Sequence, residues 1–320
     1  MYKLTQKFFK STRTLGKTSI PLSKQGLGCM SMSEFYGSPI DEKMGVELIE
    51  MAFDNGINMF DTADVYGFGK NEILLGKAVS KLLSKGVDRG QIVVATKCGI
   101  IRDEQDPAKM EIDNSYAYIK QACDTSLMRL GHDVGHIDLF YIHRIANQGS
   151  QIDEAMRAMA ELLEEGKIQA VGLSEASADI IQRSNAKLLE MTGGRHQLSA
   201  AQEEYSLMSR GIERSGVLDT CRALGITLVA YSPLSRALLT GEIETSDQFE
   251  ESDFRQAMPR FQRENLVYNN ELVSKVKEIS EKMQKMERKS IRQLKFFWLG
   301  LCIRLVCSYS WDHQNIAFIG

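Results

Sequence analysis

Polar side chains close three successive apolar runs of the chain, at the positions where buried β-strands would end. In a βα barrel, the residues at the carboxyl ends of the strands build the active site. Four of these side chains have the chemistry for catalysis, namely Asp61, Tyr66, Lys97 and His143.

These four residue types together fit proton donation to a carbonyl oxygen. A tyrosine hydroxyl has a pKa of about 10, so it is a poor acid near neutrality unless a nearby cation stabilises its phenolate form. Lys97 would be that cation, and Asp61 would hold the ammonium by ion pairing. His143 would be a second donor to the substrate oxygen. We therefore predict that Tyr66 acts as a proton donor.

Each residue alone also has a structural explanation. An aspartate after a strand often caps a helix, a lysine there is usually solvated, and a histidine after aromatic residues is often satisfied by hydrogen bonds. Polar groups in pockets can be structural as well as functional. The coincidence of all four at three successive strand ends favours the catalytic interpretation.

Short apolar runs alternate with amphipathic segments of helical length from residue 25 onward. This rhythm is typical of repeated βα units with parallel strands that are buried on both faces. The segment 41–56 shows the helical pattern, with Asp41 as a cap and Asn55-Gly56 as the stop. Seven candidate strands begin at Gln25, Ile57, Gln91, His136, Ile168, Leu198 and Ile226.

The glycine pattern favours a closed barrel over an open sheet. A doubly wound dinucleotide-binding sheet places a three-glycine fingerprint after its first strand, and "GLGCMS" lacks the third glycine. Eight βα units would instead close a (β/α)8 TIM barrel. No Pro-rich linker divides the chain, so we predict a single barrel domain over residues 1–320, with a short hairpin at 13–23 covering one end.

Charge and composition argue against several classes of partner. Lys and Arg total 39 against 42 Asp and Glu, a net charge of -3, so we expect no nucleic-acid partner. The longest apolar tract, from Phe296, is about half of the ~20 residues that a membrane span needs, and it carries Arg304. We expect no membrane span.

The cysteines and histidines give no sign of a disulfide framework or a metal site. The six cysteines form no CxxC pair, which indicates reduced thiols and a cytoplasmic location. His132 and His136 are four residues apart, but Gly135 between them favours a loop over a zinc-binding helix.

The segments that carry the four polar residues resemble a known family. "FDTADVYGFGKNE", "ATKCG" and "YIHR" are similar to the tetrad segments of the aldo-keto reductases, NADPH-dependent enzymes built on a (β/α)8 barrel. The resemblance implies that Tyr66 is the general acid, that His143 orients the carbonyl, and that Lys97 paired with Asp61 tunes Tyr66. It covers roughly residues 13–281 and is strongest to the branch of auxin-induced-type and pyridoxal-reductase-type proteins.

The same resemblance implies an NADPH site. "GLSEAS" and "AAQEEYSL" resemble the segments whose Ser and Gln hold the nicotinamide carboxamide, here Ser174 and Gln202. "VAYSPLSRALLTG" resembles the loop whose aromatic residue, here Tyr231, stacks on the nicotinamide. In that loop the backbone amides of four residues would wrap the pyrophosphate, namely Ser232, Leu234, Ser235 and Arg236.

The resemblance stops near residue 286. Family members continue to an eighth strand ending in Ile-Pro-Gly and to residues that hold the adenosine 2′-phosphate, but residues 286–320 read differently. We therefore expect an atypical tail and an eighth βα unit that is degenerate or missing. A shifted reading frame or a mispredicted exon explains this better than an amphipathic helix, because no clean apolar face is kept. The tail could supply a substitute strand, best at 302–310.

The sequence thus predicts NADPH-dependent reduction of a small aldehyde or ketone to an alcohol. The alternative is a non-catalytic nucleotide-sensing or interaction barrel, or an inactive truncated product. Retention of the tetrad favours the enzyme, whereas loss of the eighth strand would favour the inactive product. The carbonyl substrate, the preference for NADPH over NADH and the oligomeric state stay open.

Overall fold

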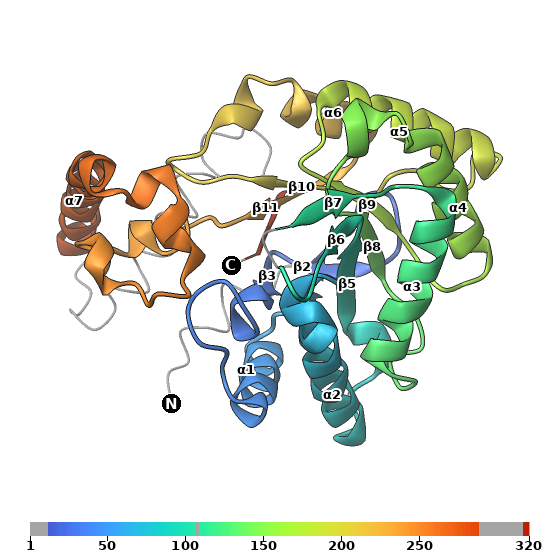
Figure 1. Cartoon of the computed structure of the whole chain (residues 1–320), viewed down its shortest axis with the longest axis horizontal. Helices are drawn as coiled ribbons and strands as arrows, with labels where there is room; N and C mark the ends of the chain where they lie inside the picture. The colour runs from blue at the N-terminus through green and yellow to red at the C-terminus, as the bar shows by residue number, and fades with distance from the viewer. Residues whose placement is uncertain (1–11, 107–108, 288–315, 320) are drawn as a thin grey trace.

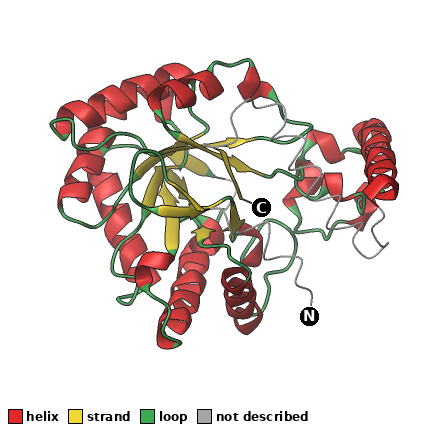
Figure 2. Cartoon of the chain, turned by 180° about the vertical axis from the view of Figure 1, so that it is seen from behind, coloured by secondary structure: helices red, strands yellow, loops and turns green. Residues whose placement is uncertain are grey.

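Eight parallel strands close into a barrel in the computed structural model, which describes residues 12–106, 109–287 and 316–319. The helices lie outside the strands (Figures 1 and 2). Around the barrel the strands are β3 (Gln25–Gly28), β4 (Met59–Asp61), β5 (Val93–Cys98), β8 (Leu139–Ile142), β9 (Val171–Ser174), β10 (Ala200–Glu204), β11 (Thr227–Tyr231) and β12 (Ile316–Ile319). The predicted TIM barrel is confirmed.

The seven predicted apolar runs each contain one of the barrel strands. Every residue of β5 is buried, because the barrel interior covers one face of the strand and helices cover the other. The long helices are α1 (Glu42–Asp54), α2 (Lys70–Ser84), α3 (Tyr116–Leu130), α4 (Ile152–Glu164), α5 (Ala178–Met191), α6 (Val217–Leu224) and α7 (Arg263–Glu287).

Helix α1 shows how local sequence sets these elements. The Asp41 side chain caps the helix by accepting hydrogen bonds from the backbone nitrogens of Lys43 and Met44, at 2.9 and 3.3 Å. Asn55 ends the helix, and Gly56 then turns the chain with a φ of 90°. Both ends lie where the sequence predicts them.

The eighth strand comes from the atypical tail. β12 pairs in parallel with β11 on one side and with β3 on the other, where Phe318 lies opposite Gln25. A Cβ atom at Gly26 would lie 2.7 Å from Cγ2 of Ile319, so a glycine is what allows β3 and β12 to approach. The predicted substitute strand at 302–310 lies outside the described residues, and four residues further along the tail fill this place.

A hairpin covers the amino-terminal end of the barrel, as expected. Its strands β1 (Thr12–Thr14) and β2 (Pro21–Ser23) pair antiparallel. Leu15 and Leu22 are fully buried, in one cluster with Met59 of β4, Val93 of β5 and other residues of the barrel interior. This packing closes one end and leaves the carboxyl ends of the strands as the place for a site.

Loops and short helices gather at the other end. A second hairpin, β6 (Ile100–Arg102) with β7 (Met110–Ile112), follows β5. The loop after β3 meets the η9 turn (Phe254–Ala257) through a hydrogen bond of 3.0 Å from the Phe254 nitrogen to the Phe35 carbonyl oxygen. Helix α7 lies to one side of the barrel (Figure 1). None of the helices within 12–106 and 109–287 is long and apolar enough to cross a membrane.

Candidate active site

A buried ion pair lies at the carboxyl ends of two neighbouring strands. Asp61 is the last residue of β4, and Lys97 lies in β5, fully buried. The Lys97 ammonium donates to the Asp61 carboxylate, to the Thr62 carbonyl oxygen at 2.8 Å and to the Tyr66 hydroxyl at 3.4 Å. Lys97 therefore joins three segments of the site.

A tight turn places Tyr66. Tyr66 begins the short helix η3 (Tyr66–Gly69), in which Gly67 and Phe68 both have a φ of 55°. The Gly67 nitrogen donates a hydrogen bond of 2.9 Å to the Glu34 carboxylate, which ties the turn to the loop after β3. At Gly69 the φ is 87°, a left-handed conformation that favours glycine, and a Cβ atom there would lie 2.4 Å from the Arg129 side chain.

His143 completes the group from the next strand end. It directly follows β8, where its backbone nitrogen donates to the Cys98 carbonyl oxygen at 2.7 Å. Its ring meets the Tyr66 ring edge-on, with centroids 5.7 Å apart. Nδ1 of His143 is buried and has no hydrogen-bond partner among the described residues. The His143 ring is thus held by packing against Tyr66, with Nδ1 left unpartnered among the described residues.

Burial sets the protonation states of these groups. It raises the pKa of Tyr66, an effect that Lys97 opposes and Asp61 reinforces. Burial alone would lower the pKa of Lys97, but Asp61 and Tyr66 outweigh it and the pKa is raised. Burial, together with Lys97 and Arg144, holds the pKa of His143 well below its usual 6.5. At neutral pH, Lys97 is thus a cation beside a protonated tyrosine and a neutral imidazole.

Two of the residues expected at the nicotinamide lie next to the four polar residues of the site. Gln202 in β10 donates from Nε2 to Oδ2 of Asp61 at 2.8 Å. Ser174 ends β9, and its hydroxyl accepts a hydrogen bond of 3.2 Å from Arg144. Tyr231, the third, ends β11 and is partly exposed. All three therefore lie at the same end of the barrel as the four polar residues.

The loop after β11 has an unusual backbone. Three successive residues, Ser235, Arg236 and Ala237, have φ values of 51°, 58° and 71°, and Ser232 has 50°. Non-glycine residues rarely adopt positive φ, and such strain concentrates at functional sites. Leu234 is partly buried against a hydrophobic cluster that includes Leu238 and Phe261, and its carbonyl oxygen accepts a hydrogen bond of 3.0 Å from the Leu239 nitrogen.

Arg236 contacts two tyrosines, one in the loop after β3 and one at the end of β11. Its Nη1 donates to the Tyr36 hydroxyl at 3.1 Å, and its guanidinium lies 5.9 Å from the centre of the Tyr231 ring. Ser235, beside it, shares a hydrogen bond of 2.7 Å with the Ser206 hydroxyl. The loop after β11 is thus bonded to the loop after β3 and to the segment after β10.

Sequence reasoning missed several residues of the site. Arg144 donates to the His143 carbonyl oxygen at 2.7 Å as well as to Ser174, and the only signal was its place in "YIHR". Phe35 lies edge-on to Tyr66 at 6.2 Å between centroids. Adjacent aromatic residues in the polar loop "SMSEFYG" were the signal for this aromatic wall.

The fold and the site together define a barrel with a buried group of four polar side chains, Asp61, Tyr66, Lys97 and His143, at the carboxyl ends of its strands. The family model for the aldo/keto reductase family matches residues 25–299. The chain belongs to the aldo/keto reductase family.

Relatives of known name support this assignment. The chain is 39% identical over 270 residues to the probable aldo-keto reductase 1 of Glycine max, covering 84% of this chain and 72% of that protein. It is 38% identical over 271 residues to the aldo-keto reductase yakc [NADP(+)] of Schizosaccharomyces pombe, covering 84% and 74%.

Solved structures show the same architecture. A glycerol dehydrogenase of Gluconobacter oxydans matches with a TM-score of 0.74 and 27% identity, over 97% of this chain and 86% of that one. An aldo-keto reductase of Bacillus halodurans, in its holo form, matches with a TM-score of 0.64 and 26% identity, over 97% and 85%.

Proposed function

We propose that this protein reduces a small aldehyde or ketone to an alcohol with NADPH, and that Tyr66 is the general acid. The observation that carries the proposal is the 3.4 Å contact between the Lys97 ammonium and the Tyr66 hydroxyl inside a buried site. Family membership supports oxidoreductase activity, and the name of the fission-yeast relative supports NADP(H) as the cofactor.

In this proposal the tyrosine keeps its proton until the substrate needs it. Because burial raises the pKa of Tyr66, its hydroxyl is a protonated donor at neutral pH. As the carbonyl oxygen gains negative charge, the proton moves to it, and the Lys97 ammonium stabilises the phenolate that remains. Asp61 holds the ammonium in place, and the neutral His143 ring orients the carbonyl oxygen.

The strand ends would hold the cofactor. Ser174 and Gln202 offer polar side chains to the nicotinamide carboxamide, and Tyr231 offers a ring face for stacking. When bound, NADPH supplies the hydride, and the protein contributes binding, orientation and electrostatics. The left-handed backbone at 235–237 and the Arg236 guanidinium fit the negative charge of a pyrophosphate.

A titration with NADPH and NADH, followed by the fluorescence of the cofactor, tests the site. We expect tight binding with a preference for NADPH, and turnover of a reactive test aldehyde. Tyr66→Phe should abolish turnover and leave the affinity for NADPH nearly unchanged. Equal loss of binding and turnover would exclude the role assigned to Tyr66.

The same assays separate the alternative functions. A nucleotide-sensing barrel would bind NADPH without turnover, and an inactive product would do neither. Loss of the eighth strand would favour the inactive product, but β12 occupies that place in the barrel.

We also propose a cytoplasmic location. The cysteines in the described part of the chain are buried free thiols, namely Cys29, Cys98, Cys123 and Cys221, and free thiols fit a reducing compartment.

A further inference from the structure

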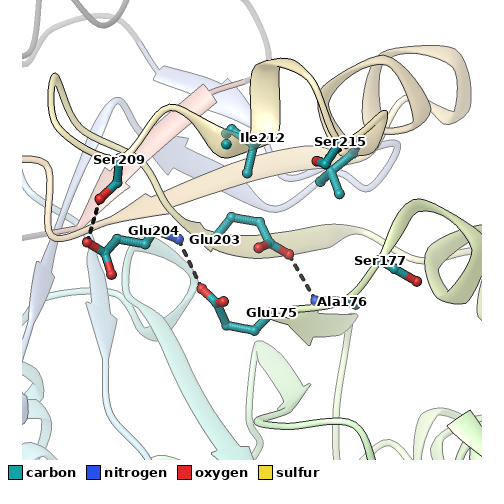
Figure 3. A pocket seen from close by; sticks show the side chains of 10 residues that line it. Glu175, Ala176, Ser177, Glu203, Glu204, Ser209, Ile212 and Ser215 are labelled. Atoms are coloured by element: carbon teal, nitrogen blue, oxygen red, sulfur yellow. Dashed lines mark hydrogen bonds between the residues drawn. The ribbon is translucent and has the colours of Figure 1, made fainter. Parts of the chain in front are cut away.

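A cavity of about 470 Å³ opens beside the candidate active site and shares no residue with it. It lies between the turn after β9 and the segment after β10 (Figure 3). Its lining includes three carboxylates, two hydroxyls and an apolar side chain, namely Glu175, Glu203, Glu204, Ser177, Ser209 and Ile212. The cavity is thus acidic on one side and apolar on the other.

One of the three carboxylates already has its cation. Glu204 pairs with Arg260 at 2.7 Å and accepts a hydrogen bond of 2.8 Å from the Ser209 hydroxyl. It is also 3.9 Å from Arg236. Its charge is therefore balanced within the protein.

The other two carboxylates have no ion pair within the described part of the chain. Glu203 is only 6% exposed, and Oε1 accepts one hydrogen bond of 3.0 Å, from the Ala176 nitrogen. Glu175 accepts a hydrogen bond of 3.1 Å from the Glu204 nitrogen and also interacts with the Tyr231 hydroxyl, and its backbone is held at a φ of 52°. Figure 3 shows both side chains in the lining of the cavity.

A buried carboxylate without a cation is costly. Burial, reinforced by the charge of Glu175, raises the pKa of Glu203 to about 8, although the Ala176 nitrogen and Arg144 oppose the shift. The reductase chemistry proposed above uses neither Glu203 nor Glu175. A buried acidic pair in a cavity, with no ion pair of its own among the described residues, is the arrangement that a ligand cation would stabilise.

We propose that this cavity binds a small organic ammonium ion, held by Glu203 and Glu175 and packed against Ile212 and Val217. An ammonium group has three donors and no acceptor, which matches carboxylate oxygens. Ile212 and Val217 in the lining suit an alkyl chain. Among the described residues, no group of three or more His, Cys, Asp or Glu side chains is arranged to hold a metal ion.

Calorimetric titration of the full chain with butylammonium chloride at about pH 8.5 tests the proposal, since the probe keeps its charge at that pH. We expect one site per chain. Glu203→Gln keeps an acceptor for the Ala176 nitrogen but removes the charge, so it should weaken binding by about tenfold or more. The matched control is Glu190→Gln on α5, an exposed glutamate outside the cavity, which should bind like the wild type.

A second variant tests the place of binding without changing charge. Gly211 lines the cavity, and a Cβ atom added there meets no atom within 4 Å. Gly211→Leu should therefore fold and obstruct the cavity, which should weaken butylammonium binding. Butanol, which has the same chain without the charge, should not bind measurably.

The affinity should also depend on pH. The titratable and charged groups that face Glu203 are Glu175 from the turn after β9, Arg144 from the loop after β8 and the Cys221 thiol from α6. Between about pH 6.5 and pH 8.5 the Glu203 carboxyl loses its proton, so the affinity for butylammonium should rise by roughly tenfold or more. The proposal is overturned by absence of binding, by equal binding of butanol, or by equal affinities of Glu203→Gln and Glu190→Gln.

Discussion

The side-chain amide of Gln202 donates a hydrogen bond of 2.8 Å to Oδ2 of Asp61. The other oxygen of Asp61, Oδ1, accepts from Lys97, so both oxygens of this buried carboxylate are occupied. In the proposed complex with NADPH, the carbonyl oxygen of the Gln202 side chain is the atom that would accept a hydrogen bond from the nicotinamide carboxamide. The residue predicted to hold the cofactor therefore also holds the acid–base group.

Asp61→Asn should be strongly destabilising. Lys97 is fully buried, and removal of its counter-ion leaves an uncompensated charge in the barrel. Breaking a buried pair in this way costs about 3–5 kcal/mol. Urea unfolding, followed by circular dichroism, would measure the loss.

The double variant Asp61→Asn with Lys97→Met is the control for this prediction. Because it removes the unpaired cation, it should recover a large part of the lost stability, while reductase activity stays absent. If the double variant were as unstable as the single one, the charge of Lys97 would not be the cause.

His143 should remain neutral in the folded protein at pH values where an exposed histidine gains a proton. Burial and two nearby cations hold its pKa well below 6.5, so nitrogen-15 NMR should report a neutral ring down to about pH 5.5. The unfolded chain takes up that proton below about pH 6.5, so the stability that His143 contributes is present above this pH and lost as the pH falls.

The corresponding stability measurement compares the wild type with His143→Gln. As the pH falls from about 6.5 to 5.5, the free energy of unfolding of the wild type should decrease by about 1 kcal/mol more than that of the variant. An equal loss in both proteins would mean that His143 titrates normally in the folded state.

Glu203 should produce the opposite dependence on pH. Its pKa is raised from 4.5 to about 8 in the folded protein, so folding retains a proton that the unfolded chain releases. The wild type should therefore lose stability as the pH rises from about 4.5 through 8. Glu203→Gln removes this titration. As the pH rises from 5 to 8, the free energy of unfolding of the variant should therefore increase by ~1 to 3 kcal/mol relative to that of the wild type. A difference that does not change with pH would contradict the shifted pKa.

Gly76→Ala should destabilise the contact between two helices. Alanine in place of glycine normally stabilises a helix interior by about 1 kcal/mol. In α2, however, the new Cβ atom would lie 2.0 Å from the Leu130 carbonyl oxygen at the end of α3, so the helices must separate. We expect a net loss of roughly 1–3 kcal/mol in thermal or urea unfolding.

Gly45→Ala in α1 is the matched control for Gly76→Ala. Its Cβ atom would lie 2.8 Å from the Leu74 side chain, which can rotate away, whereas the Leu130 backbone cannot. The loss should therefore be smaller at Gly45. Equal effects at both positions would exclude backbone contact as the reason for the glycine at 76.

The strands that could be predicted were those that carry their own signal. β5 and β8 are buried on both faces, so each appears in the sequence as an apolar run that leads into a polar residue, Lys97 or His143. Because parallel strands end at the same edge of a barrel, Asp61, Lys97 and His143 could be expected to meet. The structure brings them together, with Tyr66 added by the turn after β4.

The parts that escaped prediction depend on distant partners. β12 has four residues and is identified by its pairing with β11 and β3 more than by any local pattern. The bond between Gln202 and Asp61 joins side chains that are 141 positions apart. The positive φ values at 235–237 occur at residues other than glycine, so the residue types gave no signal for the left-handed backbone of this turn.

The pairing of β12 with β3 sets an order of events during synthesis. Domains generally fold as units while the chain emerges from the ribosome, amino-terminal parts first. Here Gln25 must wait for Phe318 before the two strands can pair. Until then β3 and β11 each present an unpaired edge, and such edges template association with other chains. The growing chain is therefore open to association with other chains until β12 has been made.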